Sequence, residues 1–133
     1  MTGTPPLHGL HHAALTVTDL AASIEWYTRV LGFAEVARWT AGGLDKALLN
    51  RPDTPPISLV AHNDSAVTGT FDEHRTGLDH LSFAVADLAE LQLWVAVLDQ
   101  HSIPHGEIVE GRTGSLVAFR DPDDIALEFY TLV

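Results

Sequence analysis

The chain has no cysteine and only one lysine among its 133 residues. Without cysteine there is no disulfide, no thiol nucleophile and no thiolate ligand, so any metal must be held by nitrogen and oxygen donors. Seven lysine and arginine residues stand against 18 aspartate and glutamate residues, and the formal net charge is −11. This balance disfavours nucleic acids and anionic membranes as partners, because both require basic patches.

Long apolar runs are also missing. No stretch approaches the roughly 18 residues of a membrane-spanning helix, and the N-terminus lacks the charged start and apolar segment of a signal peptide. A hydrophobic content of 46% with 19% charged residues is typical of a globular protein with a real core. We therefore expect one cytoplasmic domain over residues 1–133.

What the chain does contain is an internal repeat. Residues 9–21 align without gaps with residues 77–89, and seven of the thirteen positions are identical. Such repetition fixes the architecture before any other argument. One identical pair is His12 and His80, and a hydrophobic strand has no packing reason to carry a histidine twice.

Each copy begins as a strand and continues into a helix. Asp19 and Asp87 are suited to cap the two helices, and Gly32 stands where a helix C-cap glycine belongs. Clusters of glycine and proline then separate three shorter strands in each copy. The expected strands cover residues 10–17, 34–39, 46–49, 57–62, 78–85, 106–110, 115–120 and 125–132.

The pattern predicts an α+β fold made of two tandem β-α-β-β-β modules, which form a cupped mixed sheet around a metal cavity. Module one covers about residues 8–62, a linker about 63–76, and module two about 77–133. Strand alternation supports the cavity, because the face that carries each repeated histidine otherwise holds small residues. A packed core would fill that face with large side chains. The small residues are Ala14, Thr16, Ser82 and Ala84.

The last expected strand contains an acidic residue flanked by strong strand formers. Glu128 shares its face with Ala126 and Tyr130, and a buried carboxylate is costly unless it is paired or binds a metal. With His12 and His80 it would make two imidazoles and one carboxylate, a set that leaves coordination positions open. The donor types indicate one divalent ion, Fe(II), Mn(II), Zn(II), Co(II) or Ni(II), rather than calcium.

The remaining histidines carry weaker signals. His11 is matched by Asp79 in the repeat, and strand alternation places it on the helix side, in a structural role. The others lie in expected loops or at helix ends, where we expect surface positions; apart from His62 they are His8, His74, His101 and His105.

Four segments carry a resemblance to a known family. They read LHHAALTVTDL, WYTRVLGF, GLDHLSFAV and DPDDIALEF, and they resemble the vicinal-oxygen-chelate superfamily of glyoxalases, bleomycin-resistance proteins and extradiol dioxygenases. The resemblance implies paired β-α-β-β-β modules. It also implies a divalent metal held by a first-strand histidine of each module and a last-strand glutamate, roles that fall on His12, His80 and Glu128.

This chain departs from the residue patterns of some activities in the family, and these departures make those activities less favoured. Resemblance to glyoxalase I or methylmalonyl-CoA epimerase would imply a fourth ligand, Glu or Gln, on the last strand of module one. Here one alignment puts Ser58 at that position and another puts Val60, so both activities are in doubt. Fosfomycin-resistance enzymes have a threonine where this chain has Ala14. They also have a cationic pocket, which is disfavoured here because Lys46 is the only lysine of the chain.

Extradiol dioxygenases use the ligand set found here, together with a further histidine and tyrosine. The resemblance offers His62 and Tyr130 for those catalytic roles. We therefore expect a homodimeric enzyme that chelates two neighbouring oxygens of a small organic substrate, as a dioxygenase or as a lyase or isomerase. The alternative is a drug-sequestering protein of the bleomycin-resistance type, without turnover.

Overall fold

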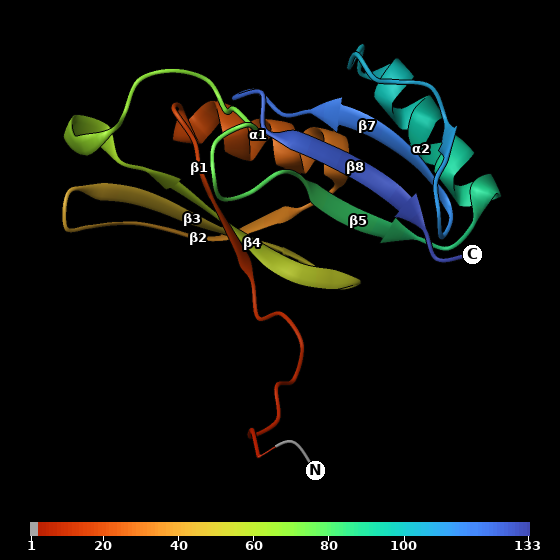
Figure 1. Cartoon of the computed structure of the whole chain (residues 1–133). Coiled ribbons are helices and arrows are strands. Elements are labelled where there is room, and N and C mark those ends of the chain that lie inside the picture. The colour runs from red at the N-terminus through yellow and green to blue at the C-terminus, as the bar shows by residue number, and fades with distance from the viewer. Residues whose placement is uncertain (1–2) are drawn as a thin grey trace. The chain divides into compact units, whose positions relative to one another are not determined.

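Figure 1 shows the computed structural model, which describes residues 3–133. The chain runs twice through the order β-α-β-β-β. The first copy contains β1 (Ala13–Thr16), α1 (Leu20–Leu31), β2 (Ala34–Ala41), β3 (Leu44–Arg51) and β4 (Thr54–Ala61). After the short 3-10 helix η1 (Asn63–Ser65), the second contains β5 (Leu81–Val85), α2 (Leu88–Gln100), β6 (Val109–Glu110), β7 (Ser115–Arg120) and β8 (Ala126–Thr131).

The chain divides into two compact units, Met1–Ala66 and Val67–Val133. Each unit has one mixed four-stranded sheet, in the order β1-β4-β3-β2 in the first and β5-β8-β7-β6 in the second. In both sheets the first and last strands of the unit pair in parallel and the remaining pairs are antiparallel. The predicted α+β class and the repeated β-α-β-β-β pattern are confirmed.

Both helices begin at the predicted aspartates. The Asp19 carboxylate accepts from the backbone N–H of Ala22, and that of Asp87 accepts from Glu90, each at 3.0 Å. α1 ends at Gly32, whose φ of 74° is the left-handed conformation that glycine adopts without strain. None of the helices within residues 3–133 is long and apolar enough to cross a bilayer.

The buried face of α2 is narrow. Leu91 and Leu98 are fully buried against the second sheet, but Leu88 in the first turn is 47% exposed. The helix lies along β7 and β8 in Figure 1. Its Trp94 ring stacks on Phe129 of β8, which stacks in turn on Phe119 of β7, with both pairs of ring centroids 4.7 Å apart.

β1 and β5 start three residues later than predicted, so His12 and His80 stand immediately before their strands. In the first sheet, β1 pairs with β4 from Ile57 onward. Pro56, the residue before Ile57, has no backbone N–H to donate, so the pairing of β4 with β1 does not extend past Ile57. In the second sheet, β8 itself begins only at Ala126, after a turn.

Candidate metal centre

The parallel pair β5–β8 separates a buried face from an open one. Leu127 and Phe129 of β8 are buried under α2, whereas Glu128 between them faces the other way and keeps 13% of its side chain exposed. Ser82 lies opposite Glu128 in the register. This alternation is the one that the sequence predicted, with small residues around an acidic side chain on the open face.

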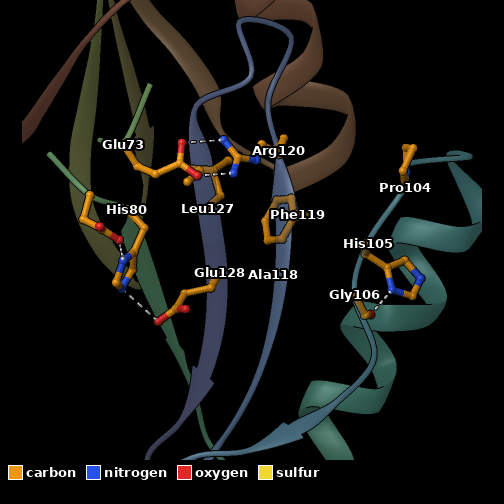
Figure 2. A pocket seen from close by; sticks show the side chains of 12 residues that line it. Glu73, His80, Pro104, His105, Gly106, Ala118, Phe119, Arg120, Leu127 and Glu128 are labelled. Carbon is orange, nitrogen blue, oxygen red and sulfur yellow. Dashed lines mark hydrogen bonds and ion pairs between the residues drawn. The ribbon is translucent and has the colours of Figure 1, made fainter. Parts of the chain in front are cut away.

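His80 and Glu128 meet on that face. The Nε2 atom of His80 lies 3.3 Å from Oε1 of Glu128, and its Nδ1 atom lies 2.7 Å from Oδ1 of Asp79 (Figure 2). Hydrogen bonding to Asp79 is the main cause that raises the pKa of His80 above its usual value, and the Glu128 charge acts in the same direction against desolvation. When Nδ1–H donates to Asp79, Nε2 is the ring nitrogen that faces Glu128.

This donor set fits a divalent metal. An imidazole nitrogen and a carboxylate oxygen from neighbouring strands face each other across a short gap. Metal-binding histidines commonly donate their other ring N–H to a carboxylate, which orients the ring and raises its basicity, and Asp79 is placed for that role. Sequence reasoning treated Asp79 only as the partner of His11 in the repeat and missed this contact.

A cavity of about 470 Å³ surrounds the pair. Figure 2 shows it between the segment before β5, the strands β7 and β8, and the loop that follows α2. Charged and titratable side chains line its wall beside the small residues Ala118 and Ala126. The charged or titratable lining residues are Glu73, Asp79, His80, His105, Arg120 and Glu128.

In the first unit, His12 is exposed at the start of β1. Its Nδ1 atom lies 2.9 Å from Nδ1 of His11. The prediction that His11 lies on the helix side is wrong: His11 is exposed too, because the strand begins only after both residues and imposes no alternation on them. His62 follows β4 and places Nε2 3.3 Å from the hydroxyl oxygen of Thr16 on β1.

The registers decide between the two candidates for a fourth ligand. Ser82 lies opposite Glu128 in the second sheet. Ala14, its repeat partner, lies opposite Ser58 in the first, whereas Val60 pairs two residues further on. Ser58 therefore occupies the position equivalent to Glu128.

Tyr130 is tied to the loop between β6 and β7. Its phenol oxygen accepts from the backbone N–H of Thr113 at 3.3 Å and from the Thr113 hydroxyl at 3.1 Å. A Cβ atom on Gly111 would come within 2.5 Å of the phenol oxygen, so glycine permits the close approach. The side-chain bond from Thr113 is the main cause that lowers the pKa of Tyr130. Because the oxygen accepts both bonds, the O–H is the donor that the phenol can still offer.

His105 is not a surface residue as predicted. Only 18% of its side chain is exposed, Nε2 lies 2.6 Å from Oδ1 of Asp99 on α2, and Nδ1 lies 2.6 Å from the carbonyl oxygen of Gly106. Two acceptors for two ring nitrogens favour the imidazolium, and the Gly106 carbonyl followed by Asp99 raises the pKa of His105. The six-residue spacing from Asp99 gave no periodic signal.

The His105 contacts predict a pH-dependent contribution to stability. Because the folded-state pKa lies above the usual 6.5, the contribution is complete below pH 6.5 and is lost as pH rises through the raised value. At pH 6, His105→Gln should lower the free energy of unfolding by about 1–2 kcal/mol. Urea unfolding of both proteins from pH 6 to 9 should show the difference shrinking with pH. If the difference in the free energy of unfolding stays constant with pH, a charged His105 is contradicted. Asp99→Asn, which removes one of the two acceptors, should also cost stability at pH 6 and lose that effect as pH rises.

Arg120 and Glu73 form an ion pair at the same cavity. Nη2 of Arg120 lies 2.7 Å from Oε1 of Glu73, and Nη1 lies 3.3 Å from Oε2 (Figure 2). Hydrogen bonding from Arg120 lowers the pKa of Glu73 to about 2. The two residues are 47 positions apart, and no sequence pattern pointed to their contact.

Comparison with known proteins places the chain. The model of the glyoxalase/bleomycin resistance protein/dioxygenase superfamily matches residues 9–129. The chain belongs to this superfamily. A crystal structure of a glyoxylase/bleomycin resistance protein/dioxygenase domain from Frankia sp. EAN1pec is 37% identical, with a TM-score of 0.86 over 95% of this chain and 93% of that one.

Two further matches carry different names. A Bacillus subtilis (strain 168) protein, MhqA, whose name proposes a ring-cleaving dioxygenase, is 27% identical over 130 residues, covering 92% of this chain. The chain spans 39% of that protein's length. A fosfomycin resistance protein of Listeria monocytogenes, FosX, solved with Mn(II), is 16% identical with a TM-score of 0.68, covering 94% of this chain and 93% of that one. The latter likeness shows the fold alone.

Proposed function

We propose that this superfamily member is an enzyme that binds one divalent metal through His12, His80 and Glu128 and uses it to chelate two neighbouring oxygens of a small organic substrate. The 3.3 Å approach of His80 to Glu128 on the open face carries the proposal. His12 joins the set because the repeat makes it the counterpart of His80 at the start of β1.

A bound divalent ion supplies Lewis-acid stabilisation of negative charge that develops on substrate oxygen. The chain's own residues orient and move protons. Asp79 holds the His80 ring through Nδ1–H, and Tyr130 offers its phenol proton because both Thr113 donors already engage the oxygen. His62, beside the Thr16 hydroxyl, is the general base that we assign.

Oxygen-dependent cleavage of a catechol-like ring is the reaction we favour, because the named activity of the 27% identical relative is ring cleavage. A lyase or isomerase acting through an enolate uses the same chelation and is the second candidate. Two nitrogen donors and one carboxylate suit Fe(II) for the first reaction and Mn(II), Zn(II), Co(II) or Ni(II) for the second.

The test is to purify the protein without oxygen and to measure bound metal by elemental analysis. The Fe(II)-loaded protein is then given catechols, with oxygen uptake and the absorbance of the ring-opened product as readouts. Metal at one ion per chain with oxygen uptake supports the proposal. A metal-free protein that binds cationic aromatic drugs tightly would instead support sequestration without turnover.

Ser58 provides a prediction about the number of ligands. If three side chains hold the metal, Ser58→Ala should leave metal affinity nearly unchanged. Ser58→Glu adds a charged oxygen donor at the position equivalent to Glu128, and it should tighten binding at least about tenfold, or ~1.4 kcal/mol. Competition with a fluorescent chelator measures both. A Ser58→Ala protein that purifies without metal would show that the serine is itself a ligand.

We also propose a homodimer as the working form. Each sheet has two edge strands, and an exposed edge invites pairing with another chain. Light scattering at micromolar concentration should give twice the chain mass, and a monomer would contradict the proposal. Mixing His12→Ala with Glu128→Ala chains then separates two arrangements: recovered metal indicates a site shared between chains, and none indicates sites within each chain.

A further inference from the structure

Arg120 lies on the open face of the second sheet, close to the proposed ligand pair. It pairs with Ala126 across β7 and β8, two positions from the pair formed by Ala118 and Glu128. Residues two apart on a strand share a face, so Arg120 and Glu128 project to the same side, and both line the cavity (Figure 2). The alanines between them leave room for a ligand that contacts both.

A carboxylate already sits on the guanidinium group. Both oxygens of Glu73 bind it, at 2.7 Å and 3.3 Å, while the carbonyl oxygen of Asp124 accepts from Nη1 at 2.9 Å. The Asp124 bond fixes the direction of the planar fork, which matches the two oxygens of a carboxylate. The guanidinium is thus held in the orientation that carboxylate binding requires.

Glu73 is a partner that a ligand can replace. It belongs to the segment before β5, which has neither helix nor strand, and the Arg120 and Glu73 side chains are 40% and 30% exposed. Ion pairs with this exposure contribute little to folding. A substrate carboxylate that is also held by its chelating oxygens can therefore displace Glu73.

The charge inventory makes this position distinctive. Within residues 3–133, Arg120 is the one lysine or arginine that lines the cavity, in a chain that has only seven such residues. At the wall, His105 is bonded through both ring nitrogens to Asp99 and Gly106. Arg120 is the cavity's only always-charged donor among the residues described.

We propose that Arg120 determines substrate specificity: it binds a carboxylate group carried by the substrate beside its two chelating oxygens, and Glu73 occupies that position in the free protein. The substrate class is therefore an ortho-dihydroxy aromatic acid or a comparable vicinal-oxygen carboxylate. This inference rests on the proposed function, because the chelating oxygens define where the rest of the substrate lies.

The test uses two probes that differ by one carboxylate, catechol and 3,4-dihydroxybenzoate, titrated calorimetrically into the metal-loaded full chain. The wild type should bind the acid roughly tenfold more tightly than catechol, the size expected for one charge-assisted pair. Arg120→Gln should bring the ratio to about one. Glu73→Gln removes the competing carboxylate and should raise the ratio severalfold.

The opposite shifts are the decisive feature. Both substitutions break the same ion pair, so a purely structural contact would move both variants in the same direction. Arg38→Gln is the matched control, because it breaks an exposed Arg–Glu pair of similar geometry with Glu35 in the first unit and should leave the ratio unchanged. Equal shifts for Arg120→Gln and Glu73→Gln, or no shift, overturn the inference.

The outcome also separates this inference from the proposed function. The same titrations are run on chelator-treated protein. If the chelator-treated protein still binds both probes and the two variants still shift the ratio in opposite directions, the metal-dependent function is contradicted. Arg120 as a carboxylate site is still supported. Normal metal and catechol binding with a ratio insensitive to Arg120→Gln would contradict the inference alone.

Discussion

Glu128→Ala, His80→Ala and His12→Ala should each abolish stoichiometric divalent metal while leaving a folded protein. A site with three protein ligands that loses one keeps too little coordination to retain the ion through purification. The fold should persist because all three side chains lie on the open face or before a strand, outside the core. Elemental analysis of the dialysed proteins gives the metal content, and circular dichroism gives the fold.

The matched control is His74→Ala. This histidine is 87% exposed and pairs with Asp72, so its removal deletes an imidazole without touching the proposed ligands. It should keep one ion per chain. Full metal in any of the three ligand variants would remove that residue from the site, and loss of metal in the control would indicate binding spread over surface histidines and carboxylates.

The fold was predictable because its signals are local and repeated. Residues 9–21 and 77–89 carry the same strand, aspartate cap and helix start, and the structure forms the same elements from both copies. Strand ends were less predictable. They depend on where a partner strand can still offer hydrogen bonds, as Pro56 shows for β1. Pro56 lies 44 residues after His12 in the chain, so the local sequence around His12 does not reveal where β1 begins.

The candidate site divides in the same way. The pairing of His80 with Glu128 followed from strand alternation and the repeat, and the structure brings the two together. Contacts made by loops did not follow. The Glu73–Arg120 pair, the Thr113 bonds to Tyr130 and the His105 contacts each join a segment without periodicity to a strand or helix. Only the folded chain shows which loop residue reaches which strand.

Two neighbouring residues of β8 point to opposite faces of the sheet, one into the cavity and one into the core. Glu128 faces the cavity, and Phe129 faces α2. The Phe129 ring is buried between Trp94 and Phe119, with a third aromatic contact to Phe83 at 6.3 Å. Substitutions at the two positions should therefore have separate consequences, which the ligand variants alone do not reveal.

Phe129→Ala should lower the free energy of unfolding by about 3–5 kcal/mol, because it removes the middle ring of the stack and leaves a cavity that α2 and β7 cannot close. Urea unfolding followed by tryptophan fluorescence, to which Trp94 contributes, measures the loss. Phe129→Leu keeps most of the volume and should lose clearly less. Below its unfolding transition, Phe129→Ala should still bind metal, because Glu128 and His80 remain. An unfolding midpoint equal to that of the wild type would contradict the role of the ring stack, whereas a stable Phe129→Ala protein without metal would mean that packing under β8 sets the ligand geometry on its opposite face.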